Sequence, residues 1–348
     1  MARQRHYREP VPEGLDLEKV GPWLEANVEG AVGPFTATLI AGGRSNLTFL
    51  VFDDAHKWVL RRPPLHGLTP SAHDMAREYK VVAALADTPV PVARAVTMRD
   101  DDSVLGAPFQ MVEHVAGRVV RYDDELEKLG DKAVISECVD ALIRVLADLH
   151  AVDPEAVGLG DFGKPTGYLE RQVRRWGGQW ELVRRDNDPC DADVKRLHSA
   201  LAEAIPPQSR SSIVHGDYRI DNTILDAQDA TKVVAVLDWE MSTLGDPLSD
   251  AALMCVYRHP MFNMIHAASA WASPLMPEVD DLANRYSLAA EQPLDNWDFY
   301  MALGYFKVAI IAAGIAFRAR MGGGVADDAD AVDKAVAPLV AEGLRILA

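Results

Sequence analysis

The chain has 348 residues, of which 49% are hydrophobic and 25% charged, so it is long enough for two lobes or domains with a large buried core. A formal net charge of −17 argues against general nucleic-acid binding, which requires a basic surface. Three widely spaced cysteines make neither a metal pattern nor a disulfide framework, and the first thirty residues lack a signal-peptide core, which predicts a cytoplasmic protein.

The first third of the chain is predicted to be rich in strands. Residues 36–40 and 47–52 have β-strand composition and are joined by Ala41-Gly42-Gly43-Arg44-Ser45-Asn46. Backbone N–H groups in such a glycine-bearing turn can approach a phosphate closely. A Gly-Gly hairpin is more often only a turn, however, and the pattern G-x-G-x-x-G is absent.

A third strand is predicted over residues 57–61 and ends at Arg61. Side chains alternate between the two faces of a strand, so Arg62 is expected to point away from the face that Arg61 occupies. A solvated surface position is the simplest interpretation for either arginine, and it fits Arg62 better.

A helix is predicted over residues 71–86. Ser71 and Asp74 have the spacing of a capping box. Apolar side chains recur at helical spacing at Met75, Tyr79, Val82 and Ala86. Glu78 borders this apolar face, from which its side chain can reach inward toward Arg61.

Two further strands are expected before the chain becomes mainly helical. Residues 88–92 end the helix and start a stretch that suggests one strand, and residues 108–115 suggest the last strand of this part of the chain. Gly117 then allows the chain to turn toward its larger, helical part.

The remaining predicted helices share apolar positions at helical spacing. They span residues 133–150, 170–185, 192–204, 247–257, 279–286, 297–320 and 330–347. The most apolar segment, residues 301–317, is interrupted by Lys307, which favours a buried helix over a membrane span. No membrane partner is therefore expected.

The strongest functional pattern begins at His215. The run His215-Gly216-Asp217-Tyr218-Arg219-Ile220-Asp221-Asn222 fits H-x-D-x-x-x-x-N, and the apolar residues 233–237 then lead to Asp238. Short predicted strands at 212–214 and 223–225 flank the loop. The pattern supplies the parts for phosphoryl transfer from ATP: a carboxylate for a hydroxyl proton, and an amide and a second carboxylate for Mg²⁺. Loop Asp and Asn residues usually cap turns, but chance rarely produces this whole order and context.

This pattern resembles the signature of the aminoglycoside phosphotransferase and choline kinase group, small-molecule relatives of the protein kinases. The resemblance extends from about Phe35 to about Arg320. It implies an α+β, two-lobed protein-kinase-like fold. Residues 1–115 would be a small β-rich N-lobe and residues 116–348 a larger, mainly helical C-lobe, with ATP between the lobes and the acceptor against the larger one.

The resemblance also implies roles for the residues of the loop. Asp217 would orient the acceptor hydroxyl and accept its proton, while Asn222 and Asp238 would coordinate Mg²⁺. Arg219 would stabilise the transferring phosphoryl group or, equally, pair structurally with Asp221.

Three neighbouring residues are expected to support the loop. His215 would hold the loop as a scaffold residue, and Asp246 and Asp250 would cap a helix or brace the loop.

In the N-lobe, the resemblance implies nucleotide contacts. Ser45 lies in the glycine turn over the phosphates, and Arg61, held by Glu78, takes the position where the family often has Lys. Arg keeps its charge and can bind phosphate through two donors, with a reach that differs from that of Lys. Backbone groups around Glu113 to Val115 would bind the adenine.

Two branches of the family compete for the acceptor, a hydroxyl-bearing small molecule. One phosphorylates aminoglycosides or related amino alcohols, and the other, fused to or encoded beside certain acyl-CoA dehydrogenases, is thought to act on hydroxyacyl thioesters. Five segments resemble the second branch: 42–46, 59–64, 76–79, 111–118 and 236–240. An antibiotic-resistance role is therefore not expected.

The predicted function is an ATP- and Mg²⁺-dependent phosphotransferase. The alternative is a nucleotide-binding, pseudokinase-like module, supported by Arg61 and the atypical glycine turn. A P-loop NTPase is disfavoured because G-x-x-x-x-G-K-[ST] does not occur. The sequence gives no oligomeric state.

Overall fold

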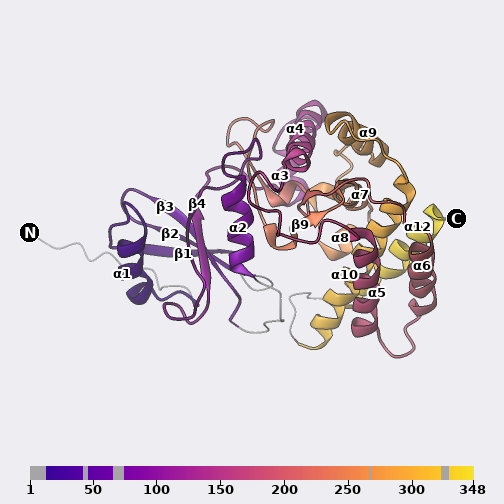
Figure 1. Ribbon diagram of the computed structural model, residues 1–348, viewed down its shortest axis with the longest axis horizontal. Helices are drawn as coiled ribbons and strands as arrows, with labels where there is room; N and C mark the ends of the chain where they lie inside the picture. The colour runs from indigo at the N-terminus through magenta and orange to yellow at the C-terminus, as the bar shows by residue number, and fades with distance from the viewer. Residues whose placement is uncertain (1–12, 42–45, 66–73, 267, 323–328) are drawn as a thin grey trace, which may run out of the picture. The chain divides into compact units, whose positions relative to one another are not determined.

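The structure, a computed structural model, describes residues 13–41, 46–65, 74–266, 268–322 and 329–348. The chain forms two compact units. One comprises the residues up to 86 together with 93–115, and the other comprises 87–92 together with 116–348. Figure 1 follows the chain from its strand-rich indigo and violet part to its helical remainder. The predicted α+β class is confirmed.

The first unit is built on a five-stranded antiparallel sheet with strand order β1-β2-β3-β5-β4. The strands are β1 (Thr36–Ala41), β2 (Leu47–Phe52), β3 (Lys57–Arg62), β4 (Ala95–Arg99) and β5 (Phe109–Glu113). Four of them lie where the residue patterns predict. The further strand expected in the stretch that starts at 88–92 is β4, which begins only at Ala95 because Pro89 and Pro91 have no N–H to give to a ladder.

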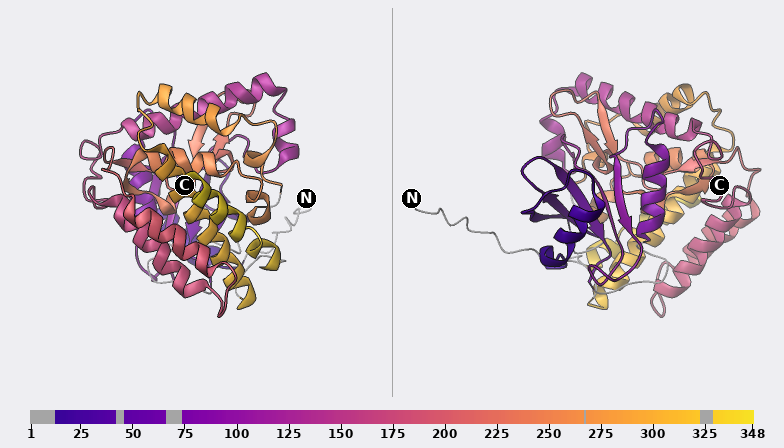
Figure 2. Two further views of the ribbon diagram at one scale, coloured as in Figure 1. Left: turned by 90° about the vertical axis from the view of Figure 1, so that its right-hand side faces the viewer. Right: turned by 60° about the vertical axis from the view of Figure 1, so that its left-hand side comes forward.

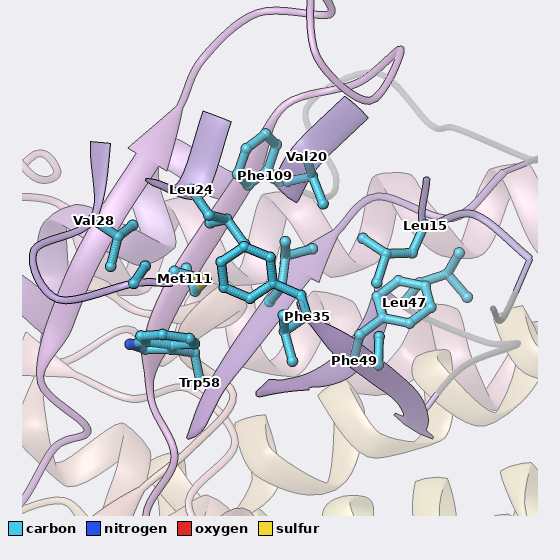
Figure 3. Close-up of a cluster of buried hydrophobic side chains, with 14 residues drawn as sticks. Leu15, Val20, Leu24, Val28, Phe35, Leu47, Phe49, Trp58, Phe109 and Met111 are labelled. Atoms are coloured by element: carbon cyan, nitrogen blue, oxygen red, sulfur yellow. The ribbon is translucent and has the colours of Figure 1, made fainter. Parts of the chain in front are cut away.

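One face of this sheet is covered by α1 (Leu17–Asn27), a helix that the residue patterns did not predict. Asp16 caps it by accepting a hydrogen bond from the N–H of Glu18 at 3.1 Å. Val20 and Leu24 of this helix pack into a fully buried apolar cluster with side chains from β1, β2, β3 and β5 (Figure 3). Burying each of these two side chains contributes about 1.5–3 kcal/mol to stability.

The alternation of β3 places its two arginines on opposite faces, as predicted. Leu60 belongs to the apolar cluster beside α1, and Arg62 lies on the same side, where its guanidinium donates to the carbonyls of Gly14 at 2.7 Å and Leu105 at 3.1 Å. The expectation that Arg62 is solvated is wrong, since only 6% of it is exposed. Two backbone carbonyls compensate for the water that this buried charge loses.

Helix α2 (Met75–Leu85) carries Glu78. The helix is capped by Asp74, whose side chain accepts from the N–H of Arg77 at 2.9 Å. Ser71 and the glycine turn with Ser45 lie outside the described residues.

The second unit is mainly helical. Its helices are α3 (Asp123–Glu127), α4 (Lys132–Ala151), α5 (Tyr168–Val183), α6 (Asp191–Glu203), α7 (Pro247–Val256), α8 (Phe262–Ile265), α9 (Val279–Ala289), α10 (Trp297–Arg320), α11 (Ala329–Asp333) and α12 (Val336–Ile346). Figure 2 shows the yellow C-terminal helices beside the rose helices α5 and α6, against which α10 and α12 pack.

Two predictions about the C-terminal helices have different outcomes. The single helix expected over 330–347 is instead α11 and α12, since Pro338 can occupy the first turn of a helix but cannot donate to the carbonyl of Lys334. Helix α10 is apolar enough to cross a membrane by composition, but 83% of its most apolar window is buried inside the protein. The prediction of a buried core helix is confirmed.

Four short strands of the second unit form two antiparallel pairs. Strand β6 (Ser212–Val214) pairs with β9 (Thr243–Gly245), and β7 (Thr223–Leu225) pairs with β8 (Val233–Val236). Strands β6, β7 and β8 were predicted from their apolar runs, and β9 was not. The segment after the first unit lies along β7, where Arg118 and Leu225 exchange backbone hydrogen bonds of 2.8 and 2.9 Å.

Gly117 has a role different from the turn that the sequence suggested. A Cβ atom at this position would lie 2.3 Å from the carbonyl oxygen of Leu225 and 2.4 Å from a methyl group of Ile224. The absence of a side chain therefore allows this segment to pack directly against the backbone of β7.

Replacement of Gly117 by Ala should lower the free energy of unfolding by about 2–3 kcal/mol, because the methyl group meets backbone that cannot move aside. Urea denaturation of the full chain measures this loss. Gly178→Ala in α5 is the control, since a Cβ there meets nothing within 4 Å and Ala should raise stability by about 0.5–1 kcal/mol. Equal effects of the two substitutions would contradict the close approach.

Candidate active site

The H-x-D-x-x-x-x-N loop connects β6 to β7, and the β7–β8 hairpin brings its end close to Asp238. The N–H of Leu237 donates to the carbonyl of Asn222 at 2.8 Å, so Asn222 and Asp238 stand at the paired ends of the hairpin. Asp238 has a φ of 62°, a left-handed conformation that residues other than glycine seldom adopt. Such conformations persist where the surrounding structure enforces them, often at functional sites.

The carboxylate of Asp217 is held by donors on both of its oxygens. Asn222 Nδ2 donates to Oδ2 at 3.0 Å and to the Asp217 carbonyl at 2.7 Å, while the hydroxyl of Tyr257 donates to Oδ1 at 2.5 Å. Burial acts to raise the pKa of Asp217, but the charge of Arg219 and the Tyr257 hydrogen bond outweigh it, and the pKa falls below its ordinary value. Asp217 is therefore ionised at neutral pH.

Arg219 is buried between acidic and aromatic side chains. Its guanidinium forms ion pairs with Asp221 at 2.7 Å and with Asp217 Oδ1 at 3.3 Å. It also lies 5.6 Å from the ring centroid of Tyr257 and 5.4 Å from that of Phe262. Of the two roles left open by the sequence, structural pairing with Asp221 is present, and a role in phosphoryl stabilisation stays a prediction.

His215 acts as a scaffold residue, as predicted. It is fully buried, and its Nε2–H donates to the carbonyl of Leu237 at 2.8 Å while Nδ1 accepts from the N–H of Asp217 at 3.2 Å. The imidazole thus ties the loop to the end of β8.

Two aspartates of the following segment brace the site, also as predicted. Asp250 accepts from the N–H groups of His215 at 2.5 Å and Gly216 at 2.8 Å. Asp246 caps α7 by accepting from the N–H of Leu248 at 3.1 Å.

Two side chains that the residue patterns did not predict also reach this loop. One is Tyr257, and the other is Lys307, whose Nζ donates to the carbonyl of Gly216 at 2.6 Å and lies 5.7 Å from the ring centroid of Trp176. A lysine inside the most apolar helix was a usable signal, because a buried charge needs a partner. Tyr257 gave no such signal, since an aromatic residue at a helix end usually serves packing.

Burial lowers the pKa of Lys307 to about 8, although Asp217 and Asp250 act in the opposite direction. This ammonium faces Asp217 and Asp250 from the loop and α7, and Arg175 from α5. The folded protein therefore favours the neutral amine more than the unfolded chain does.

In the first unit, the expected pairing of Arg61 with Glu78 is present. Nη1 of Arg61 donates to Oε1 of Glu78, and both side chains are largely buried. The pair joins β3 to α2 and fixes the guanidinium at the end of β3.

The segment expected to bind adenine is already partly used by the sheet. The N–H of Glu113 donates to the carbonyl of Arg94 at 2.9 Å and that of His114 to Lys57 at 3.0 Å. The Glu113 carboxylate forms an ion pair with Arg94 at 3.2 Å. A nucleotide contact in this segment would therefore involve the Glu113 carbonyl and the backbone of Val115.

The difference in stability between the wild type and Lys307→Met should depend on pH. The folded pKa of about 8 lies below the ordinary 10.5, so the unfolded chain binds the extra proton between these values and the wild type gains stability as pH rises through them. Relative to Lys307→Met, the free energy of unfolding of the wild type should increase by about 2–3 kcal/mol between neutral pH and pH 10.5. Urea denaturation at pH 7.5, 8.5 and 9.5 tests this, and parallel curves for the two proteins would contradict it.

Comparison with known proteins places these observations in a family. The model of the phosphotransferase enzyme family matches residues 36–297. Acyl-CoA dehydrogenase family member 11 of Homo sapiens is 32% identical over 341 residues, which are 95% of this chain and 43% of that protein. Family member 10 of Mus musculus is 35% identical over 297 residues, 84% of this chain and 27% of that protein. The chain thus spans less than half the length of these relatives.

Solved structures give the same result for the fold. A putative aminoglycoside phosphotransferase from Ralstonia eutropha JMP134 is 32% identical with a TM-score of 0.80, over 95% of this chain and 98% of that one. Aminoglycoside phosphotransferase APH(4)-Ia, in complex with AMP-PNP and hygromycin B, has a TM-score of 0.60 at 15% identity, over 94% of this chain and 97% of that one. The kinase-like fold expected from the resemblance is therefore confirmed. With residues 36–297 matched and the full-length structural likeness, the chain belongs to the phosphotransferase enzyme family.

Proposed function

We propose that this protein transfers the γ-phosphoryl group of ATP, in the presence of Mg²⁺, to a hydroxyl of a small molecule. The observation that carries the proposal is the ionised Asp217 carboxylate, gripped by Asn222 beside the hairpin end that bears Asp238. Residues 1–115 would contact the nucleotide phosphates and residues 116–348 would supply the loop and the acceptor site.

The residues at the hairpin end fit a magnesium ion. The amide nitrogen of Asn222 donates to Asp217, so the amide oxygen is the atom that can serve a cation, and Asp238 supplies a carboxylate. Mg²⁺ prefers oxygen ligands and usually takes only one or two from protein, with substrate phosphates and water completing its shell. When bound, the ion would neutralise charge on the phosphates.

On the nucleotide side, the proposal rests on Arg61. The ion pair with Glu78 fixes the orientation of its guanidinium, whose positive charge would attract a phosphate. This pairing weighs against the alternative, a nucleotide-binding module without activity, because Arg61 has the partner that an active kinase gives to its Lys.

The chemistry proposed for Asp217 follows from its lowered pKa. A carboxylate with several donors is a weak base, so it would orient the acceptor hydroxyl first and take the proton only as the new P–O bond forms. Arg219 is held within the same cluster, from which it would stabilise charge on the transferring group.

For the acceptor, we propose a hydroxyacyl thioester. The matched relatives are acyl-CoA dehydrogenase family members, and a phosphotransferase that forms part of such proteins would meet thioester substrates. An amino sugar is the competing acceptor, because the solved complex of APH(4)-Ia holds hygromycin B. The cysteines Cys138, Cys190 and Cys255 are free, which supports a reducing cytoplasm as the location.

Replacement of Asp217 by Asn should lower turnover about 10²–10⁴-fold, because the base is lost while its shape is kept. Mg-ATP should bind as in the wild type. Transfer is measured as the mass shift of aminoglycosides, choline-like amines and hydroxyacyl thioesters incubated with Mg-ATP. Asp229→Asn, an exposed turn residue at the far end of the same hairpin, is the control and should keep full turnover. Unchanged turnover in Asp217→Asn would remove this residue from the base role.

Replacement of Asp238 by Ala should abolish Mg²⁺-dependent binding of ATP, because one of two protein ligands is removed. Isothermal titration calorimetry with ATP, in the presence of Mg²⁺ and of EDTA, measures this dependence. Normal Mg-ATP affinity in the variant would show that Asp238 holds no metal.

A further inference from the structure

Helix α7 holds the catalytic loop at two points along one face. Asp250, in its first turn, accepts from the backbone of His215 and Gly216, and Tyr257, which caps its C-terminal end, donates to Asp217. The two residues are seven positions apart, which is two helical turns and therefore the same side of the helix. One rigid element thus positions both the loop backbone and the carboxylate that follows it.

The hydroxyl of Tyr257 is fixed in place by its surroundings. Only 4% of the residue is exposed, and its ring centroid lies 4.6 Å from that of Phe262. Burial, followed by the charge of Asp217, raises its pKa well above the ordinary value, so the phenol stays protonated and acts as a donor. A buried donor of this kind has little freedom to choose another partner.

The two shortest side-chain hydrogen bonds to the Asp217 carboxylate come from Asn222 and Tyr257, which differ in what else they do. Asn222 engages Oδ2 and, in the proposed function, also serves the metal. Tyr257 engages Oδ1. A donor on each oxygen fixes the rotation of the carboxylate plane, and the guanidinium of Arg219 lies beside it, with Nη2 3.4 Å from Oδ2.

We infer that Tyr257 is a positioning residue for phosphoryl transfer, which sets the orientation of the Asp217 carboxylate toward the acceptor hydroxyl. This inference rests on the proposed function. Loss of the hydroxyl would let the carboxylate turn on its remaining, longer contacts with Asn222 and Arg219. Small misplacements of a catalytic group reduce rates strongly. Because the hydroxyl of Tyr257 donates to the proposed base Asp217, the effect should fall on turnover and not on nucleotide affinity.

Tyr257→Phe tests the inference, because it removes one oxygen atom and keeps the ring against Phe262. With the acceptor that shows a mass shift, and with water as acceptor in Mg-ATP hydrolysis, kcat should fall about 10–100-fold while KM for Mg-ATP stays within about twofold. Rates are referred to the folded fraction, which near-ultraviolet circular dichroism measures.

Tyr300→Phe is the matched control. The buried hydroxyl of Tyr300 donates to Asp246 at 2.9 Å, so this variant loses a tyrosine–aspartate hydrogen bond at the other end of α7. The melting temperature of Tyr300→Phe should fall by about as much as that of Tyr257→Phe, while its kcat should stay near that of the wild type.

Wild-type kcat in Tyr257→Phe, or an equal loss of kcat in both tyrosine variants, overturns the positioning role and leaves the proposed function intact. A wild-type protein that neither transfers phosphate nor hydrolyses Mg-ATP faster than Asp217→Asn overturns the proposed function and this inference with it.

Discussion

The buried carboxylate of Asp250 is the interaction on which the site depends. It accepts from two N–H groups of the H-x-D-x-x-x-x-N loop. His150 lies 3.3 Å from it, and the opposite ring nitrogen of His150 lies 2.7 Å from the hydroxyl of Tyr286. Burial acts to raise the pKa of Asp250, but the hydrogen bonds from His150 and the Gly216 N–H outweigh burial. The pKa therefore lies below its ordinary value, and the carboxylate stays ionised. A buried charge persists only where such donors surround it, and here the donors are the loop itself.

Acidic side chains of the loop lie beside basic ones, within a chain whose net charge is −17. Asp217 and Asp221 share Arg219, and Lys307 faces the loop from α10. The field that a phosphate would meet at the site therefore cannot be inferred from the total charge, because screening by solvent weakens distant surface charges more than buried neighbours. Local pairing explains how an acidic protein can present a site for an anionic nucleotide.

Features that depend on neighbouring residues could be predicted from the sequence, whereas contacts between residues far apart in the chain could not. The loop from β6 to β8 was predictable because its motif and its apolar runs are local. Tyr257 and Lys307 reach the loop from 40 and 91 positions away in the chain, and no local pattern encodes such contacts. Arg62 was misjudged for the same reason, since its burial depends on carbonyls of distant loops.

The two side chains that the sequence did not reveal share a structural cause. Helices α7 and α10 pack closely at Gly304, where a Cβ atom would lie 2.9 Å from a methyl group of Val256. Val256 precedes Tyr257, and Lys307 follows Gly304 by three positions, nearly one turn. Gly304 thus allows α7 and α10 to pack closely, and Tyr257 of α7 and Lys307 of α10 reach the same loop from this contact. The order of the helical unit, and not the loop motif alone, fixes where Asp217 points.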